Sequence, residues 1–157
     1  MKATPGVPVS SVVAPVAPEW QAVVVASEQL SPVTVVLTFI DCINHGDIDS
    51  LSALMTDDHT LQVLDEAPLV GRLANVEAWR GYASAFPRYV IYPHEISERG
   101  DAVAVLGHTT GSHLGLPDDE EQELTVIWFA RVDCGRLSLW QIFEDDASRR
   151  REFGLDG

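Results

Sequence analysis

The residues that are best suited to carry out chemistry lie in the stretch from Val103 to Pro117, where a histidine stands among regularly spaced glycines. Small and apolar residues alternate through its first half, which predicts a β-strand, and Gly107, Gly111 and Gly115 recur every fourth residue. Glycine inside a strand marks a bend, a bulge or a close backbone approach. A strand that curves around a small-molecule cavity needs such bends. On such a strand the imidazole of His108, which titrates near neutrality, can accept or deliver a proton.

Three further ionisable residues are candidates for proton transfer. His59 follows Asp58 at the start of a predicted strand, but neighbouring strand residues point to opposite faces, so the two side chains do not form a natural pair. A structural His59 is the preferred interpretation, and a helper role beside His108 is the alternative. Asp65 and Glu144 lie near the ends of the first and last predicted strands, and either reaches a cavity only if the local register places it there. For His108 too, a histidine satisfied by backbone or threonine partners remains open.

Large aromatic side chains are prominent in a chain with only 8% aromatic residues. Core packing explains most of them, but the walls of a cavity would use the same side chains, so both interpretations can hold together. The residues that we expect to line a cavity and bind its ligand are Trp79, Tyr82, Phe86, Thr110, Trp128, Trp140 and Ile142.

Composition and motifs argue against several classes of protein. The net charge of −14 argues against nucleic-acid binding, which needs a basic patch, and no segment offers the roughly 20 apolar residues of a membrane span. Cys42 and Cys134 lack metal-ligand spacing and are interpreted as buried thiols of a cytoplasmic protein. The acidic run Asp118–Glu121 is interpreted as a solvated loop rather than a metal site. The sequence holds no phosphate loop, dinucleotide fingerprint or zinc motif, so neither a cofactor nor a metal is expected.

The elements that must position these residues follow from hydrophobic periodicity. Helices are predicted from Ser31 to Gly46, from Asp47 with Ile48, Leu51, Leu54 and Met55 on one face, and from Asn75 to Phe86; strands are predicted over His59–Asp65, Arg88–Glu98, Asp101–His113, Glu123–Asp133 and Arg136–Glu144. Two helices, a strand, a helix and then an antiparallel meander predict an α+β domain. We expect that domain over residues 30–157, preceded by a mobile Ala/Val/Pro-rich tail over residues 1–29.

Four different short sequence patterns occur, one after another, between roughly Pro32 and Leu155. They are Asn44-His45-Gly46-Asp47 with Thr56-Asp57-Asp58-His59; Gly71 with Trp79, Tyr82 and Phe86-Pro87; Gly107-His108-Thr109-Thr110-Gly111 with Gly115 and Pro117; and Gly135-Arg136-Leu137 with Trp140, Asp145 and Phe153-Gly154-Leu155. Together they resemble the nuclear-transport-factor-2-like superfamily and, within it, the SnoaL-like polyketide cyclases. The resemblance implies a curved antiparallel sheet wrapped around N-terminal helices, with a cone-shaped apolar pocket.

The resemblance does not by itself imply one activity, because this fold serves cyclases, ketosteroid isomerases, epoxide hydrolases and non-enzymatic carriers. The enzymes that this chain resembles carry a proton-transfer aspartate at the positions that match Ile142 or Val63. Neither an isoleucine nor a valine can move a proton. The catalytic residues of those enzymes are therefore not in their usual places here.

Two hypotheses follow from this departure. The first is a cofactor-independent cyclase, isomerase or lyase that acts on an apolar carbonyl or polyketide-like substrate, with His108 as the acid/base. The second is a non-catalytic module that binds or carries a small ligand. Histidines that are costly to bury favour the first, which we prefer, and the two apolar residues favour the second. The enzyme hypothesis requires that at least one of five side chains reach the cavity: His108, Asp58, His59, Asp65 and Glu144.

The resemblance also implies a homodimer formed through the open face of the sheet. Both faces of the stretch Val103–Leu106 are apolar, which is consistent with cover on both sides of the strand.

Overall fold

The computed structural model describes residues 30–155, so the predicted tail over residues 1–29 lies outside the described residues. The described elements are α2 (Pro32–His45), α3 (Ile48–Ala53), β1 (Met55–Val63), β2 (Leu69–Val70), α4 (Arg72–Ala85), β3 (Val90–Arg99), β4 (Ala102–Thr110), α5 (Asp118–Glu121), β5 (Val126–Asp133), β6 (Arg136–Glu144) and α6 (Ala147–Phe153). None of the described helices is both long and apolar enough to cross a membrane.

The first two helices form where local signals predict them. Pro32 opens α2, whose apolar stripe is buried, and Gly46 ends the helix with a φ of +66°, a conformation that glycine adopts without strain. Asp47 then caps α3, because its side chain accepts a hydrogen bond from the backbone nitrogen of Ser50 at 3.2 Å. Met55 begins β1 instead of extending α3, so the first strand starts four residues earlier than predicted.

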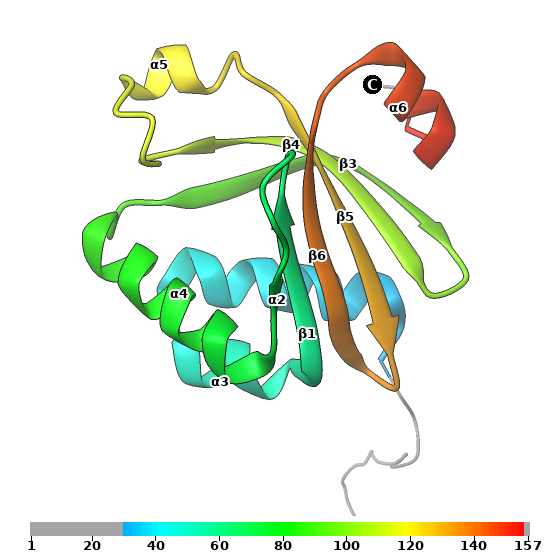
Figure 1. Cartoon of the computed structure of the whole chain (residues 1–157). Helices are drawn as coiled ribbons and strands as arrows, with labels where there is room; N and C mark the ends of the chain where they lie inside the picture. The colour runs from blue at the N-terminus through cyan, green and yellow to red at the C-terminus, as the bar shows by residue number, and fades with distance from the viewer. Residues whose placement is uncertain (1–29, 156–157) are drawn as a thin grey trace, which may run out of the picture. The chain divides into compact units, whose positions relative to one another are not determined.

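Six strands form one sheet in the order β2-β1-β6-β5-β4-β3. Every neighbouring pair is antiparallel except β1 and β6, which run parallel with Val63 opposite Ile142. The sheet is strongly curved (Figure 1), and its strands are interspersed with helices along the chain. The predicted α+β class is confirmed, and β6 spans the predicted residues Arg136–Glu144.

The two faces of the sheet pack against different helices. On the inner face, α2, α3 and α4 bury the main core against residues such as Val105, Trp128 and Trp140. On the outer face, Leu155 and Phe153 cover a smaller cluster around Leu106. Alternation along β4 therefore assigns odd-numbered residues to the main core and even-numbered residues to the outer cluster.

Asp145 fastens α6 to the end of β6. Its two carboxylate oxygens accept hydrogen bonds from Nε and from one terminal nitrogen of Arg150, both at 2.6 Å, and the hydroxyl of Thr125 donates a third bond at 2.5 Å. The paired guanidinium lowers the pKa of Asp145. A carboxylate held by a bidentate arginine and a hydroxyl is a well-defined anchor, so α6 has a fixed place on the outer face.

Two expectations about individual residues are wrong. The acidic run Asp118–Glu121 is not a solvated loop: it forms the short helix α5, and the Glu121 side chain is buried. Cys134 is exposed in the turn between β5 and β6, whereas Cys42 is buried in α2 as expected. Both differences arise because packing of the loop or turn, rather than local composition, decides the exposure of these side chains.

Candidate functional site

A small apolar cavity lies on the inner face of the sheet, beneath α4. Its volume is about 170 Å³. The residues that line it are Leu61, Val63, Ala78, Trp79, Tyr82, Tyr89, His113 and Ile142. Five of these eight side chains are hydrocarbon or indole, and the other three are two phenols and one imidazole.

Three elements supply the apolar walls. Leu61 and Val63 lie two residues apart on β1 and so share a face, and Ile142 is the neighbour of Val63 on β6. Trp79 and Tyr82 stand one turn apart on α4, so both side chains project toward these strands. The positions at which the resembling enzymes carry an aspartate, Val63 and Ile142, therefore lie side by side in the cavity wall.

The polar end of the cavity is a tyrosine–histidine pair. The Tyr82 hydroxyl lies 2.8 Å from Nδ1 of His113 and also accepts a hydrogen bond from the His113 backbone nitrogen at 3.1 Å. Burial is the main cause that raises the pKa of Tyr82, so the phenol is protonated at neutral pH. The protonated phenol donates to Nδ1, which assigns the imidazole hydrogen to Nε2. The pair thus offers a ligand one acceptor, the phenolic oxygen, and one donor, the Nε2–H group.

Tyr89 closes the cavity beside this pair. Its ring meets that of Tyr82 edge-on with 5.0 Å between centroids. Deep burial raises the pKa of Tyr89 well above its usual range, so this phenol also stays neutral. No carboxylate belongs to the cavity lining, and a neutral ligand is therefore the kind that this cavity suits.

His108, our first catalytic candidate, does not face the cavity. It stands opposite Tyr92 in the β3–β4 register, stacks on that ring with 4.7 Å between centroids, and lies on the outer face with Leu106. Its Nδ1 is 2.6 Å from Nε2 of His94. The expectation was wrong because the strand's alternation places even-numbered residues outside. The partner of His108 is another histidine, not a ligand.

His59 is completely buried, as the structural interpretation predicts. Its Nδ1 donates to the backbone oxygen of Leu137 at 2.8 Å, and Asn75 bonds the His59 carbonyl at 3.0 Å. Burial lowers the pKa of His59 and keeps the imidazole neutral. It does not line the cavity, and its neighbour Asp58 is exposed, where the Thr56 hydroxyl donates to its carboxylate at 2.7 Å.

Asp65 and Glu144 lie together, but outside the cavity. Both line a separate groove of about 260 Å³, whose other residues are Gln62, Leu64, Gln141, Phe143, Asp146 and Arg149. Asp65 belongs to the exposed turn that follows β1, and Glu144 is the last residue of β6. Each lies two residues beyond a cavity-lining residue, Val63 or Ile142, but lines this groove instead of the cavity. None of the five side chains required by the enzyme hypothesis lines the cavity, so that hypothesis has no active group in the form we gave it.

The predicted ligand-binding residues divide into three groups. Trp79, Tyr82 and Ile142 line the cavity, and their role in binding stays a prediction. Trp128 and Trp140 are fully buried in the main core and stack on each other with 6.3 Å between centroids, so they support the cavity without lining it. Two others do not line this cavity: Phe86 lines a neighbouring groove together with Trp79 and Tyr82, and Thr110 lies on the outer face with His108.

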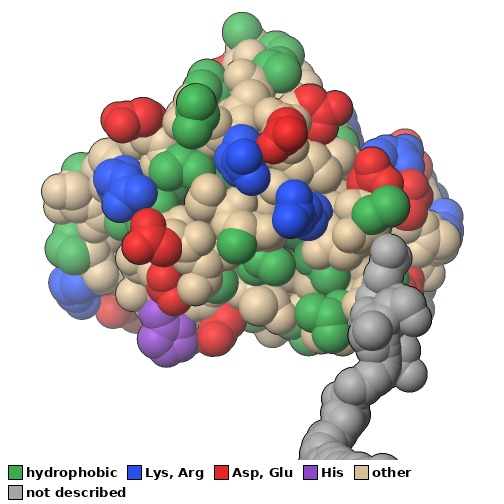
Figure 2. All heavy atoms as spheres, turned by 90° about the horizontal axis from the view of Figure 1, so that it is seen from below, with side chains coloured by type: hydrophobic (Ala, Val, Ile, Leu, Met, Phe, Trp, Pro, Cys, Tyr) green, Lys and Arg blue, Asp and Glu red, His purple; other side chains and the backbone are tan. Residues whose placement is uncertain are grey.

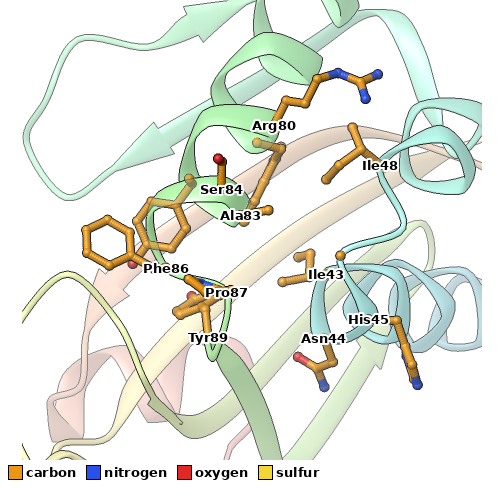
Figure 3. Close-up of a pocket in the computed structure, with 13 residues that line it drawn as sticks. Ile43, Asn44, His45, Ile48, Arg80, Ala83, Ser84, Phe86, Pro87 and Tyr89 are labelled. Carbon is orange, nitrogen blue, oxygen red and sulfur yellow. The ribbon is translucent and has the colours of Figure 1, made fainter.

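That neighbouring groove runs between the end of α2 and α4 and has a volume of about 400 Å³ (Figure 3). Ile43, Ile48 and Ala83 converge on its floor, and Arg80 and His45 extend away from it. It shares Trp79, Tyr82 and Tyr89 with the inner cavity, so these three rings form the partition between the two spaces.

Sequence reasoning missed His113 and Tyr89. The sequence places His113 at the end of the predicted strand Asp101–His113. In the structure β4 ends at Thr110, and the loop that follows folds back so that the exposed His113 ring also reaches the cavity. Gly111 allows this turn, because its φ is +70° and any Cβ at this position would collide with the backbone carbonyl oxygen of Arg88. The spacing of Gly111 and Gly115 was the one signal in the sequence that indicated a turn on either side of His113.

Two further features of the described residues are the charges on one face and the arrangement of possible metal ligands. In Figure 2, the face seen from below carries arginine side chains scattered among acidic and apolar ones. Within residues 30–155, no three His, Cys, Asp or Glu side chains are arranged to hold a metal ion.

Comparison with known proteins places this geometry among related folds. Residues 36–140 match the model of the SnoaL-like domain. A putative polyketide cyclase from Sinorhizobium meliloti is 25% identical, with a TM-score of 0.58 over 69% of this chain and 93% of that one. An NTF2-like protein of unknown function from Cytophaga hutchinsonii is 12% identical, with a TM-score of 0.59 over 80% and 96%. An LEH-like epoxide hydrolase from M. tuberculosis is 20% identical, with a TM-score of 0.56 over 73% and 82%. No curated protein matches the chain.

Proposed function

This chain belongs to the SnoaL-like domain family, and on that premise we propose that it binds one small, mainly apolar molecule with a single oxygen function in its inner cavity. The observation that carries the proposal is the lining itself: apolar walls around one hydrogen-bonding pair, with Val63 and Ile142 where the resembling enzymes have an aspartate. Binding needs only this arrangement, whereas carboxylate catalysis needs a group that the lining lacks.

The size of the cavity limits the ligand. An engineered apolar cavity of about 150 Å³ accommodates benzene. The cavity here, about 170 Å³, therefore encloses a single ring with a short substituent. This is smaller than the polyketide-like ligand expected from the resemblance. A larger molecule would have to displace the partition formed by Trp79, Tyr82 and Tyr89.

Titration with ring-sized probes tests the proposal. Cyclohexanone and 4-methylphenol should bind with one-to-one stoichiometry, measured by calorimetry, and a four-ring steroid ketone should not bind. Tyr82→Phe should weaken 4-methylphenol binding roughly 2–10-fold, the worth of one hydrogen bond. Absence of saturable binding of both single-ring probes to the unmodified protein would refute the proposal.

A pair of valine variants locates the binding. Val63→Phe fills the cavity and should abolish binding, and Val70→Phe, on exposed β2, is the matched control that should leave it unchanged. If both variants bind like the parent protein, the ligand sits elsewhere.

Proton transfer by Tyr82 and His113 is the second candidate function, favoured by the 2.8 Å bond between them inside an apolar cavity. In this version the phenolic oxygen of Tyr82 accepts a proton from carbon or water and passes its own proton to Nδ1 of His113, while Nε2–H delivers a proton to the ligand oxygen. The pair ends neutral in the other tautomer, and the protein is then a cofactor-independent isomerase, cyclase or lyase. Tyr82→Phe and His113→Ala should then each lower turnover by about 10²–10⁴-fold and change ligand affinity far less. Turnover unaffected by both variants would exclude this candidate.

The homodimer also stays a proposal, but one reason for it has weakened. The outer apolar face of Val103–Leu106 is covered by Phe153 and Leu155 of the same chain, so it does not need a second copy for cover. Light scattering at micromolar concentration distinguishes the monomer from the dimer.

A further inference from the structure

Glu121 is the one buried carboxylate among the residues that the structure describes, with an exposed fraction of 1%. Its partners are neutral: the Thr109 hydroxyl donates to Oε2 at 2.5 Å, and the Ser112 backbone nitrogen donates to Oε1 at 3.4 Å. No salt bridge joins it to an arginine of residues 30–155. A buried charge without a cation is costly, and the rest of α5 is exposed. The two hydrogen bonds that Glu121 accepts offset part of this cost.

The two partners of Glu121 lie on either side of a sharp backbone turn. Thr109 is the last inner-face residue of β4, and Ser112 follows the positive-φ turn at Gly111. The Gly111 backbone is pressed against the Arg88 carbonyl, which fixes one side of the turn. The carboxylate spans the other side and ties Ser112 back to the end of β4. The path of the chain at residue 112 is therefore set from both sides.

The residue after Ser112 is His113, which carries the imidazole of the cavity. Both its ring and its backbone nitrogen bond the Tyr82 hydroxyl, at 2.8 and 3.1 Å. A shift of the backbone at Ser112 would move both groups together. We propose that Glu121 is a positioning residue of the cavity, which holds Ser112 and thereby keeps His113 against Tyr82 at the cavity's polar end.

The charge of Glu121 supports the same role. Burial is the larger cause that raises the pKa of Tyr82 and of Tyr89, and the nearby Glu121 carboxylate raises both further. Both phenols therefore stay protonated, and Tyr82 stays a donor to Nδ1 of His113. The significance of this inference rests on the proposed function, because the pair matters only if the cavity takes a ligand.

The experiment uses the full chain with four substitutions. Glu121→Ala removes both hydrogen bonds. Glu121→Gln retains them, because its amide oxygen accepts from Ser112 and its NH₂ group donates to the Thr109 hydroxyl. Thr109→Val removes the shorter bond alone. Glu120→Ala, at an exposed position of the same helix, is the matched control.

The main readout is the ¹⁵N spectrum of the His113 ring, assigned with His113→Asn. The unmodified protein should show the Nε2–H tautomer. Glu121→Ala and Thr109→Val should give the averaged tautomers of a free histidine, Glu121→Gln should restore the native signal, and Glu120→Ala should not change it. A native His113 signal in Glu121→Ala, even with a lower melting temperature, would overturn the proposal. If Glu121→Ala does not fold, a native His113 signal in Thr109→Val would overturn it instead.

Ligand kinetics give a second readout with 4-methylphenol as the probe. Its dissociation should become about tenfold faster in Glu121→Ala and be restored in Glu121→Gln, whereas equal rates in all variants would contradict the positioning role. If the unmodified protein does not bind the probe, the proposed function fails, but the His113 spectrum still decides the role of Glu121.

Discussion

The inner and outer faces of the same sheet divide the polar groups of this chain unequally. The inner face carries an apolar cavity whose lining contains no carboxylate. The outer face carries the His94–His108 pair. A separate polar groove is lined by Asp65, Glu144 and Arg149. Residue types that are suited to catalysis are therefore frequent in the chain but concentrated away from the cavity. The comparison teaches that, on a strand, a shift of one position decides whether an ionisable group meets a ligand or solvent.

The largest effect should come from the core that supports the inner face. Trp128 is 1% exposed and does not line the cavity, so Trp128→Ala should destabilise the fold by about 3–5 kcal/mol through lost packing. Thermal melting measures the loss. Tyr92→Ala on the outer face, at a site 42% exposed, is the control and should cost far less. If Trp128→Ala melts normally but loses ligand binding, the division into support and lining is wrong.

An intermediate effect should appear in the pH dependence of stability through His59. Burial is the main cause that lowers its pKa below the ordinary 6.5, so the unfolded chain takes up the proton first as the pH falls. The free energy of unfolding should be greatest above about pH 6.5 and should decrease below it, with a slope of up to about 1.4 kcal/mol per pH unit for one proton. Urea titrations between pH 5 and 8 measure it.

His59→Gln sharpens this test, because it should lower stability at every pH but flatten the slope. His45→Gln, at an exposed site on α2, should leave the slope intact. A slope that persists in His59→Gln would mean that another group carries the pH dependence.

The smallest effect is expected at His108, the residue whose position differs most from the sequence-based expectation. His108→Gln should change stability by no more than about 1 kcal/mol and should leave ligand binding unaltered, because the side chain faces away from the cavity. Calorimetry with 4-methylphenol compares it with Tyr82→Phe. A loss of binding in His108→Gln equal to that in Tyr82→Phe would break the contrast between the two faces.

The fold was predictable because its signals are local. Ser31-Pro32, Gly46 and Asp47 mark the ends of the first two helices. The alternation of apolar and polar residues predicts β6 with its observed bounds. The family resemblance then arranged these elements correctly. The α+β class and the cavity-side position of Ile142 needed no knowledge of side-chain contacts.

The site was less predictable because it depends on strand parity and on a long loop. The face of His108 follows from which neighbours of β4 are buried, and both sets, Val103 and Val105 or Ala104 and Leu106, are apolar. His113 reaches the cavity only because residues 111–117 fold back, and that path depends on Glu121, whose burial its acidic neighbours concealed. Contacts between segments distant in sequence decide both outcomes.

The parallel pairing of β1 with β6 has a consequence for how the protein is made. The contact between His59 and Leu137 joins residues 78 positions apart, and such distant pairings form late in folding. At roughly 5–20 residues per second, a ribosome delivers β6 several seconds after β1. During that interval Leu61 and Val63 have no strand to pair with on that side, and the wall that they share with Ile142 does not exist. The cavity is therefore among the last parts of the nascent chain to form, and its apolar strand β1 is a natural target for chaperones during translation.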